Sequence, residues 1–288
     1  MVSATIIVTG GDAQFFSFMH AAIESLRSHA ATRSLALGVI DQGLTEEQQA
    51  RLETLGCTIV RPEWTLPVPQ AARQLRNIGL VARTALRDYF PGYRTYLWFD
   101  ADAWMQTPEF VGAYIEGANA HGAAVVTENG PGYRATWRDR RWWIGNMLAS
   151  FGPIAGARCS LSPSINIGVL CLKDTAPHWD AWTRRYTQAL RRTGKVNMDQ
   201  HAFLAAIVLD DLDTAWLPAR FNWLPHLSCP VWDERSRLLC EPAPPYRPLS
   251  VIHLAGPRKD RSYEVSWVSG GSFATSLTYP AMQPYLTA

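Results

Sequence analysis

The chain has 288 residues, 47% of them hydrophobic and 18% charged, and its formal net charge is +2. This is the composition of a globular protein, and a chain of this length can bury a core without disulfide bonds or a structural metal. No run of basic residues stands out, which argues against nucleic acid as a partner.

The first elements in chain order are a strand, a turn and a helix. The apolar run Thr5–Val8 predicts a buried strand, and Thr9-Gly10-Gly11-Asp12 predicts the turn. Apolar residues then recur at helical spacing from Phe15 to Leu26. This order is typical of a nucleotide-binding α/β unit, because a helix N-terminus offers free N–H groups. The turn has neither a GxGxxG motif nor a P-loop lysine, which disfavours dinucleotide and P-loop sites.

The next stretch predicts two more strands and a long helix with a basic stripe. Strands are expected at 35–40 and 57–60, with helices at 45–55 and 71–90. In the helix at 71–90 the apolar residues share one face, and four arginines fall on a narrow neighbouring stripe: Arg73, Arg76, Arg83 and Arg87. A solvated basic face accounts for most of them. Arg83, at the seam with the apolar face, is the one expected to reach into a site.

The second half continues the alternation, with long stretches that lack a steady period. Strands are expected at 95–99, 123–127, 166–172 and 249–253, and helices at 179–190 and 199–209. Residues 128–164 and 218–245 are interpreted as irregular, and 128–164 as a functional loop or lid. The tail after Arg261 shows no clear period either. Alternating strands and helices predict an α/β fold with a mostly parallel sheet.

The most informative pattern is the apolar run Tyr96-Leu97-Trp98-Phe99 followed by Asp100-Ala101-Asp102. In open α/β sheets, ligands bind at the carboxyl ends of strands. Two carboxylates placed there repel each other unless a cation lies between them. Mg²⁺ and Mn²⁺ prefer oxygen ligands and keep open positions for phosphate oxygens. The pair therefore predicts a divalent metal site that binds a diphosphate.

The chain carries five short motifs whose order and spacing together are specific. They are Ile6–Asp12, Trp98–Asp102, Ile165–Val169, Met198–Gln200 and His253–Lys259, and Leu217–Asn222 is a further, weaker match. In these motifs the chain resembles family 8 of the retaining glycosyltransferases, which includes glycogenin and bacterial lipopolysaccharide galactosyl- and glucosyltransferases. The resemblance implies a GT-A fold, a Rossmann-like mixed and mostly parallel sheet flanked by helices. It also implies a catalytic domain over 1–260 and a C-terminal extension over 261–288.

The resemblance implies roles for individual residues. Asp100 and Asp102 would bind Mn²⁺ or Mg²⁺, with His253 as the third ligand. The metal would stabilise the negative charge that grows on the departing nucleoside diphosphate, and Lys259 would add a second positive charge there. Donor-binding roles fall to Thr9, Gly10, Arg83, Ala101 and Gly256. The catalytic residues that hold the donor sugar at its reacting face would be Asn166, Asp199 and Gln200.

The expected reaction moves a hexose from a nucleotide diphosphate sugar, with UDP-hexose as the expected donor, and retains the anomeric configuration. The acceptor is left open between a glycan, a lipid-linked molecule and a protein. An inverting enzyme would need a carboxylate base near the acceptor hydroxyl, for which Glu128 and Asp199 are the candidates.

Two further functions also stay open. One is that of a sugar-nucleotidyltransferase, although Gly10-Gly11-Asp12 lacks the basic residues usual in its N-terminal loop. The second is that of a non-catalytic protein that binds nucleotide sugars or glycans.

Cysteine content and hydropathy bear on location. The five cysteines are odd in number and form no CxxC pair, which favours reduced, buried thiols. Met1–Val8 has no basic start and no long apolar core, so no signal peptide is expected. No stretch approaches the roughly 18 apolar residues of a membrane span. We expect a cytoplasmic protein, and the tail 261–288 is left open to contact with a membrane surface or a second copy.

Overall fold

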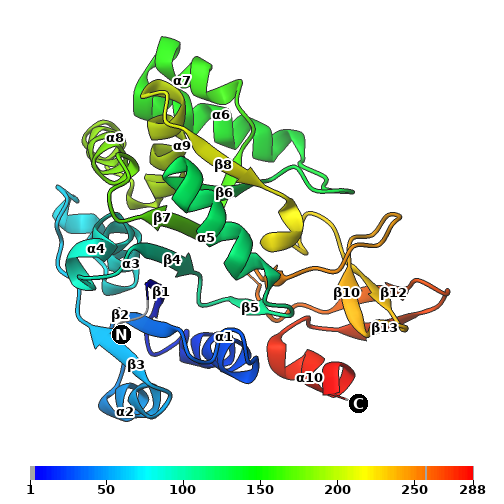
Figure 1. Ribbon diagram of the computed structural model, residues 1–288. Coiled ribbons are helices and arrows are strands. Elements are labelled where there is room, and N and C mark those ends of the chain that lie inside the picture. Colours follow the sequence, from blue (N-terminus) through cyan, green and yellow to red (C-terminus); the bar gives the residue numbers. More distant parts are fainter. Residues whose placement is uncertain (1–3, 257, 288) are drawn as a thin grey trace.

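The computed structural model describes residues 4–256 and 258–287 and is built on a seven-stranded sheet in the order β3-β2-β1-β4-β7-β6-β8 (Figure 1). The strands are β1 (Thr5–Gly11), β2 (Ala36–Asp41), β3 (Cys57–Val60), β4 (Thr95–Phe99), β6 (Ala123–Thr127), β7 (Ile165–Lys173) and β8 (Thr214–Leu217). Neighbouring strands are parallel except at β7, which runs antiparallel to β4 and β6. The predicted α/β fold with a mostly parallel sheet is confirmed.

Two of the motif-bearing strands at the centre of the sheet, β1 and β4, are apolar because both of their faces are covered. Along β4, Tyr96 and Trp98 enter one hydrophobic core, while Leu97 and Phe99 enter the other. The side chains of β1 alternate between the same two cores. A strand buried on both faces reads as a continuous apolar run, which is why these strands are visible in the sequence.

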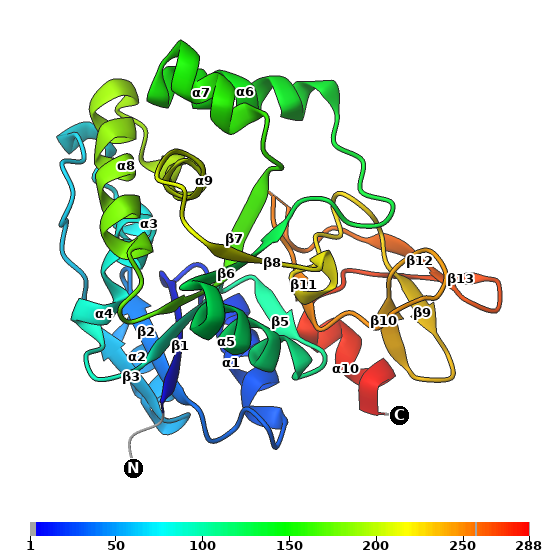
Figure 2. The ribbon, with the colours of Figure 1, turned by 45° about the horizontal axis from the view of Figure 1, so that its top comes forward.

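Helices cover both faces of the sheet. One face carries α1 (Phe16–Ser28), α2 (Glu46–Thr54) and α5 (Glu109–His121), and the other carries α8 (His178–Thr193) and α9 (Asp199–Leu209). Two further helices, α6 (Trp137–Phe151) and α7 (Pro153–Ser160), form an outer layer against α8 and α9 (Figure 2). Residues 201–206 of α9 are all buried, and a helix that is apolar all round needs cover on every side.

The single helix expected at 71–90 is wrong. The segment contains 3₁₀ turns at Gln70–Ala72, Leu75–Asn77 and Arg83–Ala85 and two short helices, α3 (Ile78–Ala82) and α4 (Leu86–Tyr89). The backbone leaves helical geometry at Gln74 (ψ 135°) and Ala85 (φ −129°). Tertiary contacts override the helical period here. Arg83 is buried beside the carboxylates after β4, whereas Arg73 and Arg76 are exposed as expected.

The irregular structure expected at 128–164 is also wrong, because most of this segment is α6 and α7. The role of the segment as a lid stays a prediction. Thr136 caps the start of α6, and it exchanges hydrogen bonds with Asp139 three residues later. Gly152 lies at φ +85°, where glycine is favoured, and Pro153 opens α7. The Thr136–Asp139 cap and the Gly152-Pro153 pair can both be read in the sequence. The many tryptophans and arginines of the segment hide its helical period, because they occur on the exposed side of α6 as well as on the buried side.

The glycine turn expected at 9–12 begins later than predicted. Gly10 and Gly11 lie inside β1, where they pair with Ile40 and Asp41 of β2. A Cβ on Gly10 would approach the Ile40 side chain to 3.0 Å, so the glycine serves close strand packing rather than a turn. The chain turns at Asp12, whose carboxylate accepts hydrogen bonds from the N–H groups of residues 14 and 15.

The C-terminal part forms a second, smaller sheet in the order β10-β9-β12-β13. Its elements are β9 (Val231–Asp233), β10 (Leu238–Cys240), β12 (Tyr263–Trp267) and β13 (Ser272–Thr275), followed by α10 (Tyr279–Thr287). Secondary structure therefore occurs both in the stretch expected to be irregular, 218–245, and in the tail. The division of the chain at residue 260 stays a prediction.

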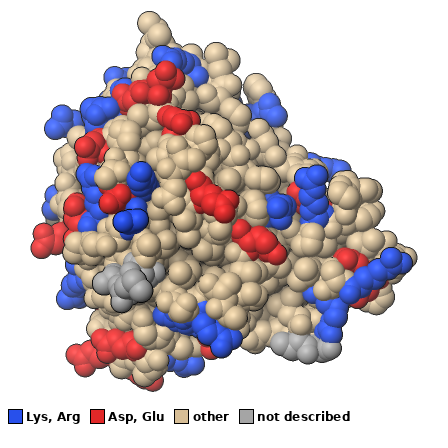
Figure 3. Space-filling model, in the orientation of Figure 1, with Lys and Arg blue, Asp and Glu red and all other residues tan. Residues whose placement is uncertain are grey.

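The remaining expectations concern cysteines and membrane segments. All five cysteines are free, and all but Cys229 are buried. Among the residues that the structure describes, no helix is both long and apolar enough to cross a membrane. Over the face seen in Figure 3, acidic and basic side chains are intermingled. Pro257 of the fifth motif and residues 1–3 of the N-terminal stretch lie outside the described residues.

Candidate functional site

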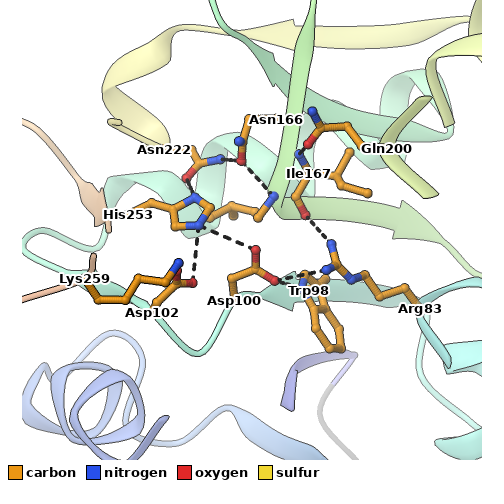
Figure 4. A network of polar contacts seen from close by, with 12 residues as sticks. Arg83, Trp98, Asp100, Asp102, Asn166, Ile167, Gln200, Asn222, His253 and Lys259 are labelled. Carbon is orange, nitrogen blue, oxygen red and sulfur yellow. Dashed lines mark hydrogen bonds and ion pairs between the residues drawn. The ribbon is translucent and has the colours of Figure 1, made fainter. Parts of the chain in front are cut away.

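Two carboxylates and one imidazole meet where β4 ends. Asp100 follows β4 directly, and Asp102 lies in the turn that leads into β5 (Ala103–Met105). β5 pairs antiparallel with β11 (Val251–His253), and this register sets His253 opposite Ala103. The His253 Nε2 atom lies 3.3 Å from Asp102 Oδ1 and 3.5 Å from Asp100 Oδ2 (Figure 4). One ligand atom from each of the three residues lies within 4.8 Å of the others.

A glycine on the neighbouring strand makes room for this cluster. The Asp100 N–H donates to the Gly168 carbonyl of β7 at 2.7 Å. A Cβ on Gly168 would lie 2.1 Å from His253 Cε1 and 2.9 Å from Asp100 Oδ2. No side chain fits at this position. Gly168 belongs to the third sequence motif, but only the structure shows what the glycine does.

A buried pair of amides orients His253. Its Nδ1 lies 3.0 Å from Asn222 Oδ1, and the Asn222 amide donates to Asn166 Oδ1 at 2.9 Å. The Gly168 N–H donates to the same Asn166 oxygen at 2.9 Å. Because the Asn222 oxygen can only accept, the proton of the neutral imidazole lies on Nδ1, and the Nε2 lone pair faces the carboxylates. Sequence reasoning assigned no role to Asn222, although the weaker sixth match contained it.

The outer oxygens of the two carboxylates already have partners. The Trp98 indole donates to Asp100 Oδ1 at 2.6 Å, and Lys259 Nζ contacts Asp102 Oδ2. Burial would raise the pKa of Asp102. The charge and hydrogen bond that His253 has when it is protonated, together with those of Lys259, outweigh burial and hold the pKa of Asp102 below its ordinary value. Asp100 Oδ2, Asp102 Oδ1 and His253 Nε2 face one another, and two carboxylate oxygens with one imidazole nitrogen suit a divalent cation.

Arg83 lies between the metal-ligand cluster and Asp199. Its guanidinium is 3.5 Å from Asp100 Oδ1 and 3.6 Å from Asp199 Oδ2, and it lies 4.9 Å above the Trp98 ring. Burial alone would lower the pKa of Arg83, but the two carboxylates outweigh burial and raise it. Burial raises the pKa of Asp199, against the effect of Arg83. The buried arginine therefore keeps its charge and links the two carboxylates.

Most of the predicted site residues line one pocket of about 210 Å³. Gln200 borders it and accepts a hydrogen bond from the Ile167 N–H at 3.3 Å. Gly256, at φ +101°, adopts a backbone conformation that favours glycine. The predicted residues that line the pocket are Arg83, Asp100, Asp102, Asn166, Asp199, Gln200, His253, Gly256 and Lys259.

Three predicted donor-binding residues do not line this pocket. Thr9 and Gly10 are buried within β1, and among the described residues the Thr9 hydroxyl has no hydrogen-bond partner. Ala101 lines a separate small pocket with Phe18 and Trp104, on the side of α1. The donor-binding role of these three residues stays a prediction.

A larger pocket of about 530 Å³ adjoins the first and shares Gln200 with it. Its walls come from the start and middle of α6, residues 160–164 and His226. Glu128 also lines it and accepts a hydrogen bond from the Asn166 amide at 3.4 Å. Burial raises the pKa of Glu128. Sequence reasoning named Glu128 but did not foresee a pocket here, because α6 was not expected.

Comparisons with known proteins show the fold. No protein-family model and no curated protein matches the chain. The galactosyltransferase LgtC in complex with donor and acceptor sugar analogues is 15% identical, with 88% of this chain and 87% of that one covered at a TM-score of 0.54. The bifunctional glycosyltransferase WbbM is 13% identical, and the match covers 90% of this chain and 47% of WbbM at a TM-score of 0.55. The glycosyltransferase GlyE of Streptococcus pneumoniae TIGR4 is 13% identical, and the match covers 100% of this chain and 61% of GlyE at a TM-score of 0.55. The predicted GT-A fold is confirmed.

Proposed function

We propose that this chain is a metal-dependent glycosyltransferase that moves a hexose from a UDP-hexose donor to an acceptor hydroxyl with retention of configuration. The observation that carries the proposal is the convergence of Asp100, Asp102 and His253 in one pocket at the carboxyl end of β4. A GT-A fold surrounds that pocket, and ligands of such sheets bind at strand ends.

The pocket residues supply positive charge and close backbone approach to a diphosphate. When bound, a divalent cation held by Asp100, Asp102 and His253 supplies Lewis-acid stabilisation of the leaving nucleoside diphosphate. Lys259 and Arg83 add two cationic side chains that line the same pocket. Gly256 presents backbone without a side chain, so phosphate oxygens can come close to the loop.

The larger pocket is the proposed acceptor site. It meets the donor pocket at Gln200, so an acceptor hydroxyl there would lie beside the donor sugar. Its lining combines the aromatic rings of Trp142 and Trp143 with serine, amide and carboxylate groups. Aromatic faces suit the apolar faces of sugar rings, and polar groups fix their orientation. This lining supports a sugar-bearing acceptor.

Glu128 supports a second candidate, an inverting transferase. Asp199 is buried against Arg83, whereas Glu128 lines the acceptor pocket and contacts the donor pocket through Asn166. Its raised pKa suits a general base. The anomeric configuration of the product, read by NMR, separates the two candidates. Retention with substantial turnover in Glu128→Gln supports our proposal, and inversion with loss of turnover supports the second.

The metal assignment is tested with Asp102→Asn. We expect Mn²⁺-dependent hydrolysis of UDP-hexose to fall by at least about 100-fold, because charge stabilisation by the metal contributes several kcal/mol. Asp180→Asn, on an exposed carboxylate of α8, is the matched control and should keep full turnover. Unchanged hydrolysis in Asp102→Asn would contradict the metal assignment.

A binding measurement accompanies the turnover assay. Thermal shifts with UDP, GDP, CDP and dTDP sugars, with and without Mn²⁺, identify the preferred base. A Mn²⁺-dependent shift without any hydrolysis or transfer would instead favour a non-catalytic binding protein.

A further inference from the structure

The outer helices α6 and α7 expose large apolar side chains to solvent. Trp137 is 75% exposed, Ile154 is 87% exposed and Leu161, which follows α7, is 89% exposed. Along α6 the outward stripe consists of Trp137, Arg141, Ile144 and Leu148, at helical spacings of four, three and four residues. Ile154 and Leu161, seven residues apart, lie on one side of α7. Both helices form the outermost layer over α9 (Figure 2).

The same segment carries an excess of positive charge. Residues 134–161 contain five arginines: Arg134, Arg138, Arg140, Arg141 and Arg158. Their one acidic residue is Asp139, which is engaged in the cap of α6 with Thr136. Arg192, at the end of α8, lines a shallow hollow beside Ile154 and Arg158. The exposed apolar side chains are therefore interleaved and rimmed with basic ones.

We propose that α6 and α7 form a docking surface for an anionic lipid bilayer, with Trp137, Ile154 and Leu161 inserted at the headgroup boundary. Helices that lie in a membrane interface combine aromatic and aliphatic side chains with Lys or Arg residues. The guanidinium groups of Arg138, Arg141 and Arg158 would contact lipid phosphates, which attract basic residues near the surface.

The charge of the surface disfavours the other occupants. A second copy of the chain in a two-fold dimer would set this arginine-rich surface against itself, and like charges would face each other. A nucleic acid also carries phosphates, but it offers little to the exposed aliphatic side chains of Leu148, Ile154 and Leu161. A bilayer supplies anionic groups and hydrocarbon together.

Docking at this surface would place the proposed acceptor site beside the bilayer, an inference that rests on the proposed function. Ile144 of the outward stripe and Leu161 are exposed and also line the larger pocket. A lipid-linked acceptor would reach Gln200 directly from the bilayer. Of the three acceptor classes left open by the sequence, docking therefore favours the lipid-linked one.

The test is co-sedimentation of the full chain with vesicles of phosphatidylcholine alone or mixed with phosphatidylglycerol. We expect binding to the anionic vesicles only, weakened by added salt. Trp137→Ser combined with Leu161→Ser should lower partitioning by about tenfold or more, since each side chain loses its apolar burial. Arg138→Gln combined with Arg141→Gln should lower it by about fivefold per arginine. Unchanged thermal unfolding verifies that the variants fold.

The matched controls lie in the smaller C-terminal sheet and in the turn between β9 and β10, apart from α6 and α7 (Figure 1). Trp267→Ser, on a tryptophan that is 41% exposed in β12, and Arg235→Gln should bind vesicles like the wild type. The proposal is overturned if anionic vesicles do not bind, or if the α6–α7 variants bind like the wild type. It is also overturned if Trp267→Ser alone removes binding, or if the α6–α7 variants only dissociate a dimer. The assay measures no turnover, so its failure is distinct from failure of the proposed function.

Discussion

At the scale of residues, the candidate site depends on groups behind the metal-ligand cluster. Asn222 fixes the tautomer of His253 by accepting from Nδ1, and Asn166 holds the Asn222 amide in turn. Gly168 leaves the space that the imidazole occupies. Second-layer hydrogen bonds of this kind set both the orientation and the basicity of a ligating histidine. Asn222 is a positioning residue in this arrangement.

Asn222→Ala should weaken Mn²⁺ binding by about 10- to 100-fold, because His253 loses its orienting acceptor. Isothermal titration with Mn²⁺ and UDP measures the change. Asn222→Asp keeps an acceptor for Nδ1 and should restore part of the affinity. Asn119→Ala, on the exposed side of α5, is the control and should bind like the wild type. Equal affinities in Asn222→Ala and the wild type would show that Asn222 does not position the ligand.

At the scale of elements, α6 is joined to α9 through an aromatic stack around His201. The imidazole is stacked on Trp143, with ring centroids 4.3 Å apart, and meets the edge of Trp142 at 5.1 Å. Both ring nitrogens are buried, and among the described residues neither has a hydrogen-bond partner. Burial, assisted by the charge of Lys195, lowers the pKa of His201 to about 4. The neutral imidazole thus belongs to the folded packing of the outer layer.

This burial makes stability depend on pH. Between the ordinary value of about 6.5 and the folded pKa of about 4, the unfolded chain binds the proton and the folded chain does not. The free energy of unfolding should therefore fall as pH falls through this window, by up to about 3 kcal/mol from His201. Denaturant titrations at several pH values measure the slope.

His201→Phe should reduce that slope, because a phenyl ring fills the stack without titrating. The rest of the slope stays with His178 and His226, because burial lowers the pKa of each to about 4 as well. Trp142→Phe retains the histidine, its stack on Trp143 and an aromatic ring at position 142, and it should keep the acid-dependent slope. Identical slopes in His201→Phe and the wild type would assign the acid sensitivity to other groups.

At the scale of the whole molecule, the C-terminal segment supports the pair of short strands that brings His253 to Asp102. Trp104 of β5 packs against Tyr279 of α10, and its indole donates to the Leu277 carbonyl at 2.8 Å. β12 pairs with β9, so residues before and after the expected boundary at 260 share one sheet. The β5–β11 pair therefore lies between the large sheet and the C-terminal elements.

Deletion of 261–288 should unfold or strongly destabilise the chain. A third hydrophobic core, separate from the two cores of the large sheet, contains Trp104 and Trp223. The deletion removes Leu277, Tyr279 and Met282 from this core and exposes Trp104. Each large-to-small loss in a core costs about 2–5 kcal/mol, so the sum is on the order of the total stability of a domain. Thermal unfolding followed by circular dichroism measures the loss, and Tyr279→Ala should show an intermediate decrease. A truncated chain with unchanged unfolding would instead support an independent domain over 1–260.

The amino-acid sequence by itself determined the main strands and the acidic end of β4. The strands expected at 57–60, 95–99 and 123–127 coincide with β3, β4 and β6, because apolar runs bounded by turns encode burial locally. The capping residues of α6 and α7 were also readable, but the arginine- and tryptophan-rich stretch hid their period. Local patterns report which residues are buried and with which period.

Only the tertiary structure decided how distant segments meet. The approach of His253 to Asp102 depends on the β5–β11 register across about 150 residues of chain, and Asn222 joins them from a third segment. Arg83 lies in a 3₁₀ turn rather than in a regular helix, and its ion-pair partners, Asp100 and Asp199, lie in other elements. No local period encodes such contacts. They form because buried charges require partners, and only the folded sheet brings those partners together.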